Sequence, residues 1–308
     1  MYVHRLDDSY TVNENTIITI GNYDGLHRGH SFLLNKLTSL AKKYALSSVL
    51  VTFNPHTKSI IKDPNFKVIT TFNDKINLAK KLNIDFICEV NFDKTIKDLN
   101  FKDFINVIIS KYNPSIILFG YDNKIGKNRI GSYEVINEYL KDSNIKIIEC
   151  DEYKSSNSRV TTSVIKENII NYNIRLANKL LGRNYLIKGK VVKGESKGKK
   201  IGFPTANVEI NSFEQLIPPN GVYSVTLKVG NNKYNSICNI GYCPTIKDNS
   251  KIISIEVHVI NHNLQLYNKN VEVEFVDFIR KEKTFKSEED LVNQIKKDIL
   301  KVNLKGYK

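Results

Sequence analysis

Residues 16–30, TIITIGNYDGLHRGH, carry the pattern that decides the fold of the first half of the chain. An apolar run of strand length ends at Gly21, a glycine-rich turn follows, and helical spacing begins at His30. A strand that turns directly into a helix is the repeating unit of an α/β fold, and ligands bind in such folds beyond the carboxyl ends of the strands. The turn is therefore the first place to look for a site.

The remainder of the first half continues this alternation of apolar runs and amphipathic stretches. The pattern predicts a parallel sheet covered by helices, with site residues in the loops after Gly21, Asn54 and Gly120. Further strands are predicted at residues 48–54, 86–90, 115–120 and 145–149, and helices at residues 30–44, 73–82, 101–112 and 132–140.

After residues 181–183 (LGR) the pattern changes to short alternating runs separated by Gly and Pro, which predict a small closed antiparallel β-barrel. A last helix is indicated by residues 287–290 (SEED), a serine N-cap with a carboxylate three residues later. The fold class is thus α/β plus all-β, with one domain over residues 1–183 and a second over residues 184–308. Strands of the second domain are predicted at residues 185–192, 221–229, 234–240, 252–259 and 271–279.

The composition of the 308-residue chain, 41% hydrophobic and 25% charged, is that of an ordinary folded protein. No apolar run is long enough for a membrane span, and the first residues lack the apolar segment of a signal peptide. The four cysteines lack zinc-site spacing, and His258 and His262 lie in an alternating strand, so we expect reduced thiols and no metal site there. The sequence predicts a cytoplasmic protein that does not bind membranes, and it carries no signal for an oligomeric state.

The net charge of +14 raises the alternative of nucleic-acid binding, since clustered Lys and Arg neutralise phosphates. The excess is mostly lysine, however, and it is spread from end to end without a zinc-finger or RNA-binding motif. The same charge also suits the phosphates of a small nucleotide. We therefore expect no nucleic-acid partner, and a nucleic-acid-binding protein with a basic barrel is the alternative from a different class.

The turn at residues 21–30 has the chemistry of a phosphate site. Its glycines allow the backbone to approach a phosphate chain, and the N–H groups at the start of the helix favour anions. His27 and His30 are three residues apart, and both can donate hydrogen bonds to phosphate oxygens. The alternative is that the two histidines only cap or fill the fold.

This segment resembles the HxGH signature of the nucleotidyltransferase superfamily, and its longer form, GxYDGxHxGH, resembles the bacterial bifunctional riboflavin kinase and FAD synthetase family. The resemblance implies a Rossmann-like domain that transfers an adenylyl group from ATP to FMN and so produces FAD and pyrophosphate. Three more segments are similar to motifs of that family: residues 52–56 (TFNPH, for TFxPHP), 120–131 (GYDNKIGKNRIG, for GxDFxFGxxxxG) and 159–166 (RVTTSVIK, for RxSSTxIR).

By this resemblance, His27 and His30 bind the triphosphate and stabilise charge while the FMN phosphate attacks the α-phosphorus of ATP. Catalysis would then rest on positioning and electrostatics, without a covalent intermediate. The other implied nucleotide ligands of this domain are Gly21, Asp24, Gly29, Arg159 and Thr162, and its implied flavin ligands are Asn54 and Asp122.

The chain departs from the family pattern at four positions of the first domain. Thr57 replaces the second proline of TFxPHP, and Lys166 replaces an arginine. Asn123 and Ile125 replace aromatic residues. A lysine keeps the charge of arginine but loses its bidentate fork. One alternative is therefore a chain that is mainly a riboflavin kinase, with a first domain that has lost its activity or uses another phosphate acceptor.

Residues 194–207 (GESKGKKIGFPTAN) resemble the riboflavin kinase signature, a glycine-rich flap followed by GFPTAN. Thr205 and Asn207 alternate onto one face of an extended segment, so a hydroxyl and an amide oxygen can reach one hard cation such as Mg²⁺. By the resemblance, Gly194 and Lys199 close over the ATP phosphates, with lysine where the family usually has arginine. The second domain would then convert riboflavin and ATP to FMN and ADP.

Two later segments extend this resemblance: residues 239–245 (NIGYCPT, for NIGxxPT) and 254–260 (SIEVHVI, for a VExHxxD-type strand). Glu256 lies between apolar neighbours in an alternating strand, so its carboxylate faces either water or a site. The resemblance makes Glu256 the general base that takes the proton of the riboflavin 5′-hydroxyl, and it places Arg280 near the flavin. The alternative for Glu256 is an exposed surface position.

Overall fold

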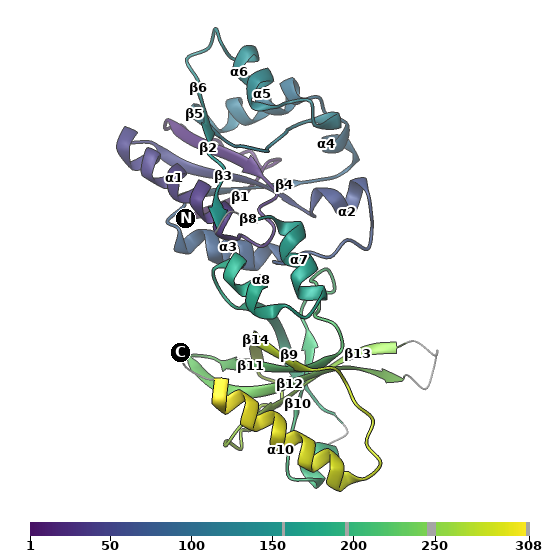
Figure 1. Ribbon diagram of the computed structural model, residues 1–308. Coiled ribbons are helices and arrows are strands. Elements are labelled where there is room, and N and C mark those ends of the chain that lie inside the picture. Colours follow the sequence, from purple (N-terminus) through teal and green to yellow (C-terminus); the bar gives the residue numbers. More distant parts are fainter. Residues whose placement is uncertain (156–157, 195–196, 245–250, 306–308) are drawn as a thin grey trace. The chain divides into compact units, whose positions relative to one another are not determined.

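The computed structural model of the protein describes residues 1–155, 158–194, 197–244 and 251–305. These residues form two compact units, Met1–Thr162 and Ser163–Lys308. The first unit is built on an open sheet and the second on a closed barrel (Figure 1). Each unit therefore has its own scaffold for a site.

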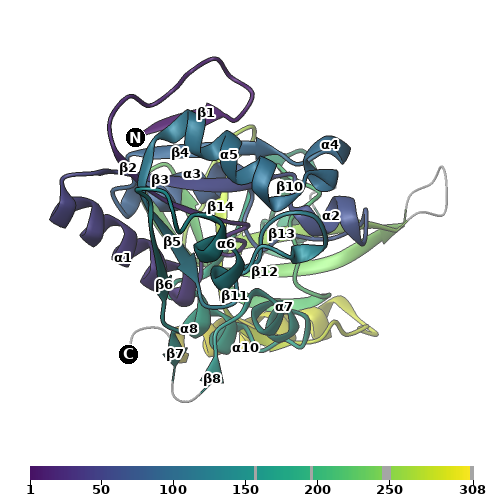
Figure 2. The same cartoon turned by 90° about the horizontal axis from the view of Figure 1, so that it is seen from above.

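The sheet of the first unit consists of six strands, and all neighbouring strands run parallel. They are β1 (Tyr2–Arg5), β2 (Thr16–Gly21), β3 (Ser47–Asn54), β4 (Phe86–Asn91), β5 (Pro114–Gly120) and β6 (Lys146–Cys150). The order is β1-β4-β3-β2-β5-β6, and Figure 2 shows β1 outermost, beside β4. The chain leaves β2 toward β3 and later returns to its other side as β5. This reversal creates the switch point at which open α/β sheets bind ligands.

Helices bury both faces of this sheet. α1 (Arg28–Tyr44) and α3 (Phe72–Lys81) pack on the face that contains Leu50 of β3, and α5 (Phe101–Tyr112) and α6 (Tyr133–Tyr139) pack on the face that contains Val49 and Val51. Strands that are buried on both faces read as continuous apolar runs, which is the pattern seen in the sequence. The loops contain α2 (Thr57–Ile61), α4 (Lys94–Asp98), the 3₁₀ turn η1 (Lys127–Arg129) and a small sheet of β7 (Lys154–Ser155) and β8 (Ser158–Arg159).

The second unit is a closed antiparallel barrel with the strand order β10-β13-β12-β11-β14-β9. Burial alternates along β9, and inward side chains such as Ile187 and Val191 fill the interior. Pairing of β9 with β10 closes the barrel. The strands are β9 (Tyr185–Val192), β10 (Ala206–Ile210), β11 (Gly221–Val229), β12 (Asn232–Pro244), β13 (Lys251–Val259) and β14 (Asn270–Arg280).

Four helices accompany the barrel: α7 (Thr162–Ile170), α8 (Ile174–Leu181), α9 (Lys197–Lys200) and α10 (Glu288–Lys305). α8 packs against β14 and β9, and α10 packs against β12, where Val302 joins a cluster with Ile237. The Ser287 hydroxyl accepts the N–H of Asp290 at 3.1 Å, which confirms the predicted N-cap.

The predicted fold class is confirmed, and each predicted strand and helix is present. The sequence pattern missed ten elements, because short elements carry too little of a repeat to be recognised: β1, β7, β8, β10, α2, α4, α7, α8, α9 and η1. The compact units divide at residues 162 and 163, since α8 packs against the barrel strands. The division at residue 183 as a boundary between functional domains stays a prediction. Cys88, Cys150 and Cys238 are buried free thiols, as expected.

The barrel closes where the backbones of β9 and β10 approach each other at Gly189, and a substitution at this residue tests that packing. A Cβ atom there would lie 2.3 Å from the carbonyl oxygen of Glu209, so we expect Gly189→Ala to lower the free energy of unfolding of the second unit by about 2–3 kcal/mol. Gly230→Ala is the control: its φ of 59° is strained but no atom lies within 4 Å of an added Cβ, so the loss should be about 1 kcal/mol. Equal losses in urea unfolding would contradict the packing argument.

Candidate active sites

The turn between β2 and α1 has a left-handed backbone. Tyr23, Gly25 and Leu26 have φ angles of 49°, 81° and 37°, in a region that costs a non-glycine residue about 1–2 kcal/mol. The Tyr23 hydroxyl compensates by forming a hydrogen bond of 2.7 Å with the Thr19 hydroxyl, and its ring is buried. Burial also raises the pKa of Tyr23 above its ordinary value, so the hydroxyl stays protonated.

Asp24 attaches the same turn to the rest of the first unit. One of its carboxylate oxygens accepts the N–H groups of Ile69 and Thr70, at 2.8 and 3.1 Å. Its backbone carbonyl accepts the hydroxyl of Thr162 at 3.1 Å. Two predicted nucleotide ligands, Asp24 and Thr162, thus contact each other and hold the turn in place.

His27 and His30 lie together at the start of α1. Their rings stack with centroids 3.7 Å apart and an interplanar angle of 16°, and His27 Nδ1 accepts the backbone N–H of His30 at 3.3 Å. A Cβ atom at Gly29 would lie 3.2 Å from the His27 ring, so glycine leaves room for the stack. The pair occupies a helix N-terminus, where the helix dipole and N–H groups favour an anion.

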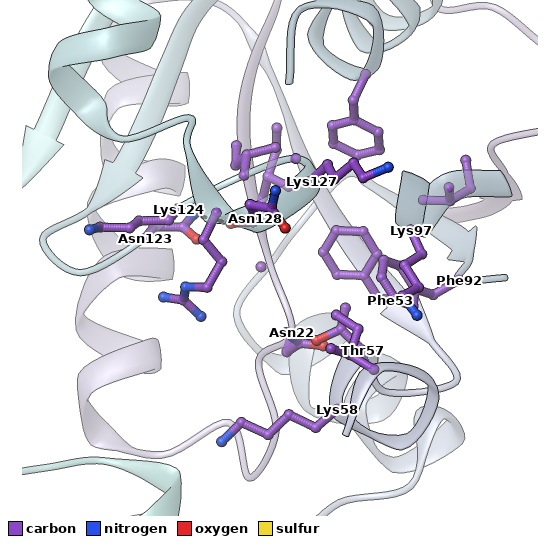
Figure 3. Close-up of a pocket in the computed structure, with 18 of the residues that line it drawn as sticks. Asn22, Phe53, Thr57, Lys58, Phe92, Lys97, Asn123, Lys124, Lys127 and Asn128 are labelled. Atoms are coloured by element: carbon purple, nitrogen blue, oxygen red, sulfur yellow. Dashed lines mark hydrogen bonds between the residues drawn. The ribbon is translucent and has the colours of Figure 1, made fainter. Parts of the chain in front are cut away.

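A pocket of about 390 Å³ opens at the carboxyl ends of β2 and β3. The rings of Phe53 and Phe92 form an apolar wall with centroids 5.4 Å apart, and Figure 3 shows Asn123 and Lys124 on the opposite side. Gly21, a predicted nucleotide ligand, also lines the pocket. An apolar wall with surrounding cations suits an aromatic anion. The basic lining residues are Lys58, Lys62, Lys97, Lys124, Lys127 and Arg129.

Asn54, a predicted flavin ligand, ends β3 but is not among the described residues that line this pocket. Its side-chain amide donates to Glu89 at 2.6 Å, and the other oxygen of Glu89 lies 3.7 Å from Arg5 Nε. Its neighbour Phe53 lines the pocket instead. In this structure Asn54 therefore connects β3 to β4.

Arg159 ends the short strand β8 and Asp122 follows β5, and neither is among the described residues that line this pocket. Arg159 Nε is 2.8 Å from a carboxylate oxygen of Glu152, and its guanidinium carbon is 6.0 Å from the centroid of the Tyr121 ring. Asp122 is exposed in the turn after β5, next to Tyr121. A ligand phosphate would have to compete with Glu152 for Arg159.

In the second unit, three polar residues form a row across neighbouring strands. Glu256 of β13 is directly opposite Asn207 of β10 and Asn239 of β12, so all three side chains lie on one face of the barrel wall. The Thr205 hydroxyl donates to one Glu256 oxygen at 3.4 Å, and the Ser254 hydroxyl donates to the other at 3.3 Å. The structure thus brings the predicted base and both predicted metal ligands together.

Gly194 lies against the side chain of Asn207. A Cβ atom at this position would be 1.9 Å from the Asn207 amide nitrogen, so only glycine permits the contact. Gly194, Thr205 and Asn207 line a pocket of about 250 Å³, together with Asn263 and Tyr267 of the loop after β13. Gly194 of the flap, the PTAN segment and this loop therefore share one pocket.

Arg280, the predicted flavin residue at the end of β14, forms a buried ion pair with α10. Its Nε lies 2.8 Å from Asp298 Oδ2, and Gln294 donates to the other carboxylate oxygen at 2.8 Å. Asp298 is 1% exposed. The carboxylate is thus fully hydrogen-bonded, and the guanidinium has a fixed orientation.

Comparison with known proteins identifies the family to which this chain belongs. A family model described as FAD synthetase matches residues 9–164, and one described as riboflavin kinase matches residues 181–304. A protein of Buchnera aphidicola subsp. Schizaphis graminum named bifunctional riboflavin kinase/FMN adenylyltransferase is 36% identical over 94% of this chain and 93% of its own length. This chain belongs to the bifunctional riboflavin kinase/FMN adenylyltransferase family.

Other relatives of the same name extend this match. The Bacillus subtilis protein is 32% identical over 92% of this chain and 90% of its own, and the Escherichia coli K12 protein is 29% identical over 97% and 94%. A crystal structure titled macrolide-efflux protein, from Streptococcus pneumoniae, covers 99% of both chains with a TM-score of 0.90 and 24% identity, which shows the fold alone. Within the residues that the structure describes, no helix has the length and apolar character to span a membrane.

Several residues near the sites of this bifunctional riboflavin kinase/FMN adenylyltransferase chain escaped the sequence analysis. Lys75 of α3 is buried beneath the β2–α1 turn, and Asp298 holds Arg280. Each is a charged residue on the buried face of its helix, at a position where the helical pattern calls for an apolar residue. A charged residue at such a position can be recognised from the sequence alone. Phe92, Asn263 and Tyr267 carried no such signal.

Some predicted residues of the kinase half of this family member do not line the smaller pocket or lie outside the described residues. Lys199 is exposed on α9 and is not among the described residues that line the smaller pocket. Flap residues 195–196 and Thr245 of the NIGYCPT segment lie outside the described residues.

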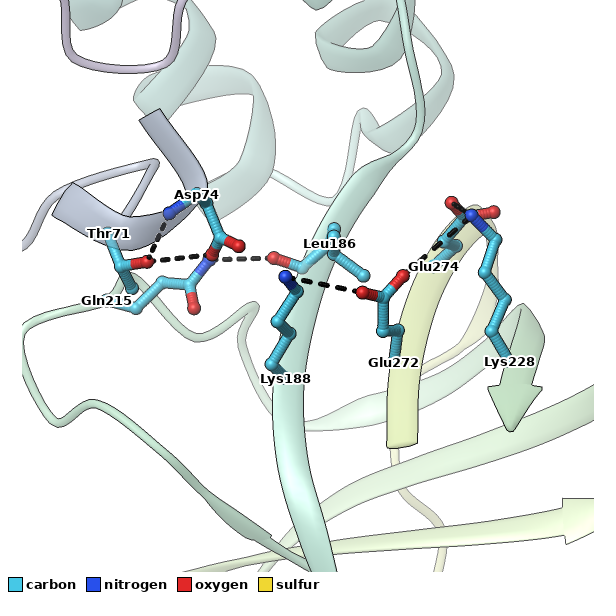
Figure 4. Close-up of polar contacts among 8 residues, drawn as sticks. All are labelled: Thr71, Asp74, Leu186, Lys188, Gln215, Lys228, Glu272 and Glu274. Atoms are coloured by element: carbon cyan, nitrogen blue, oxygen red, sulfur yellow. Dashed lines mark hydrogen bonds and ion pairs between the residues drawn. The ribbon is translucent and has the colours of Figure 1, made fainter. Parts of the chain in front are cut away.

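A charged row on the barrel of this family member has a structural explanation. Lys188 lies 3.3 Å from Glu272, Lys228 lies 3.9 Å from the other oxygen of Glu272, and Lys228 also pairs with Glu274 (Figure 4). All four are partly exposed residues of β9, β14 and β11. Such pairs contribute little to stability, and we assign no ligand to this row.

The ion pair of Asp298 makes a prediction for stability. Removal of Asp298 leaves the partly buried Arg280 guanidinium without its carboxylate, although its hydrogen bond to the Lys281 carbonyl remains, so we expect Asp298→Ala to lower the free energy of unfolding of the riboflavin kinase unit by about 3 kcal/mol. Asp290→Ala in the exposed first turn of the same helix is the control and should lose under about 1 kcal/mol. Urea unfolding measures both, and similar losses for the two variants would contradict the assignment.

Proposed function

We propose that this chain phosphorylates riboflavin to FMN in its second unit and adenylylates FMN to FAD in its first. The observation that carries this proposal is the presence, on one chain, of a stacked histidine pair at a helix start and a Thr–Asn–Glu row in a separate barrel. ATP is the donor in both reactions, and the products are ADP and pyrophosphate respectively. Riboflavin kinase and FMN adenylyltransferase activity then share one polypeptide.

In the kinase reaction, Glu256 is the general base. Its carboxylate receives the proton of the riboflavin 5′-hydroxyl as that oxygen forms a bond to the γ-phosphorus, and the bond from phosphorus to the ADP oxygen breaks. Thr205 and Ser254 hydrogen-bond the carboxylate and orient it. The pocket beside Gly194 receives the nucleotide, and the absence of a Cβ at Gly194 allows the side chain of Asn207 to lie against this residue at the edge of the pocket. Arg280, held by Asp298, is the flavin-side cation.

The residues around Glu256 also fit a magnesium ion. Mg²⁺ prefers oxygen ligands, and the Thr205 hydroxyl and Asn207 amide oxygen lie on the same face as the Glu256 carboxylate. When bound, the ion neutralises charge on the phosphates of ATP. Thr205 and Asn207 would hold it, while Glu256 keeps its role as the base.

In the adenylyl transfer, His27 and His30 bind the phosphates of ATP at the start of α1. An FMN phosphate oxygen forms a bond to the α-phosphorus, and the bond to the pyrophosphate oxygen breaks. The imidazoles stabilise the charge that develops, which is the main task in such reactions. The β2–α1 turn that carries the histidines is fixed by Asp24 and Thr162, so little reorganisation is needed on binding.

The larger pocket supports FMN as the acceptor in this reaction. Its volume of about 390 Å³ lies in the usual range for small-ligand sites. The Phe53 and Phe92 rings offer a wall for the flavin, and Lys58, Lys97 and Lys127 attract its phosphate. We place the protein in the cytoplasm, where ATP is available and buried thiols stay reduced.

Variants at the two sites should separate the activities. Glu256→Gln removes the base, so we expect FMN formation from riboflavin to fall about 10²–10⁴-fold while FAD formation from supplied FMN is unchanged. His30→Ala should do the reverse, with FAD formation reduced about 10²–10³-fold. Chromatographic separation of riboflavin, FMN and FAD over time measures both steps.

Glu209→Gln on β10 is the matched control for Glu256→Gln, because Glu209 is an exposed glutamate in the same barrel. It should behave as the wild-type chain in both assays. If the wild-type chain converted riboflavin only to FMN, the adenylyl transfer assigned to the first unit would be wrong. If it converted neither substrate, the whole assignment would be wrong.

Metal dependence provides a separate test of Thr205. Chelation of divalent cations should stop FMN formation, and titration with Mg²⁺ should restore it. Thr205→Val removes one ligand oxygen, so the Mg²⁺ concentration for half-maximal kinase rate should rise about tenfold or more, while the metal dependence of FAD formation stays the same. An unchanged Mg²⁺ titration of kinase activity in this variant would exclude Thr205 as a ligand.

A further inference from the structure

We propose that Lys75 is a positioning residue for adenylyl transfer: it holds the carbonyl of Asn22 and thereby fixes the turn that carries His27 and His30. This inference rests on the function proposed for the first unit. Lys75 lies on α3, and its side chain is only 5% exposed. No role in packing requires a lysine there, because a methionine of similar length would fill the space without a charge.

The contacts of the Lys75 ammonium are specific. Nζ donates to the backbone carbonyl of Asn22 at 2.7 Å and to the Thr52 hydroxyl at 2.9 Å. The Thr52 hydroxyl in turn donates to the Asn22 carbonyl at 3.2 Å. Lys75 and Thr52 thus meet at one oxygen, on the residue that directly follows β2.

The position of that oxygen explains why the contact matters. Asn22 is the first residue of the turn, and left-handed backbone begins one residue later at Tyr23, with φ of 49°. The side chain of Asn22 also exchanges two hydrogen bonds with Thr57, at 3.0 and 3.2 Å, at the start of α2. A rigid Asn22 peptide therefore sets both the path toward His27 and the edge of the larger pocket.

Burial of an ammonium is unfavourable unless nearby groups compensate for lost hydration. Desolvation lowers the pKa of Lys75 to about 8, although the carboxylates of Asp24 and Glu89 act in the opposite direction. Asp24 lies on the turn itself, Glu89 lies on β4, and the Phe72 ring on α3 is 5.6 Å from Nζ. Lys75 is therefore charged at neutral pH and loses its proton in mildly alkaline solution.

Deprotonation of Lys75 allows a role in positioning the turn to be distinguished from a role in stability alone. The folded-state pKa lies below that of the unfolded chain, so the unfolded chain binds more protons between the two values. The contribution of this group to stability then rises with pH in that window. If the ammonium positions the turn, FAD formation falls as pH rises through about 8. If Lys75 had only a structural role, its deprotonation would not lower the rate of FAD formation while leaving the stability of the chain intact.

The test compares Lys75→Met, Lys75→Arg and a matched control, Lys80→Met, on the exposed face of the same helix. The assay is FAD formation from FMN and ATP at several pH values, with kinase activity of the same chain as an internal reference. We expect Lys75→Met to lower kcat for FAD formation about tenfold to a hundredfold, with kinase activity unchanged. Lys80→Met should match the wild type.

Lys75→Arg should retain FAD formation, and its alkaline decline should move to higher pH because a guanidinium stays charged. Wild-type rates in Lys75→Met, or the same alkaline decline in the wild type and Lys75→Arg, would overturn the inference. If Lys75→Met does not fold, the comparison of the pH profiles of FAD formation in the wild type and in Lys75→Arg tests the inference by itself. A wild-type chain that forms no FAD would instead refute the proposed adenylyl transfer, and the inference with it.

Discussion

The pairing of β2 with both β3 and β5 is the constraint on which the first site depends. β2 is buried on both faces, so the point at which the chain leaves the sheet is fixed by its neighbours. The turn that follows must bring His27 to the start of α1 within a few residues, and left-handed residues make this possible. In the barrel, the second site depends on the pairing of β13 with β10 and β12, because this pairing places Asn207 and Asn239 beside Glu256.

In each unit, a buried charged residue contacts a segment that is proposed to form a site. Lys75 fixes a carbonyl of the phosphate turn, and Asp298 fixes the guanidinium of Arg280. In both cases the charged group acts on a neighbour and does not itself line a described pocket. A charge inside a protein is retained only where hydrogen bonds offset its desolvation. A buried charged residue therefore indicates that the segment it contacts is held in one conformation.

Three of the four departures from the family pattern, at Thr57, Asn123 and Ile125, have structural roles in this chain. Thr57 supplies an N–H and a hydroxyl that bond the side chain of Asn22, and a proline at that position has neither group. Asn123 donates its amide to the carbonyl of Ile20, and Ile125 is buried in the core. At the edge of the larger pocket, a hydrogen bond of Asn123 thus takes the place of an aromatic residue of the family motif, and two hydrogen bonds of Thr57 take the place of a proline. The changed residues are thus compatible with a structured edge of the larger pocket, which all three of them line.

The sequence by itself determined the two fold classes, the longer strands and most of the longer helices, and it predicted the histidine pair and the residues around Glu256 as sites. It did so because hydrophobic periodicity and contiguous motifs are local properties of the chain. Tertiary structure decided that Asn54 contacts Glu89, that Asp24 holds the turn, that Lys75 contacts Asn22 and that Asp298 contacts Arg280. Those contacts join residues far apart in the chain, and the direction of a side chain depends on packing that no local pattern contains.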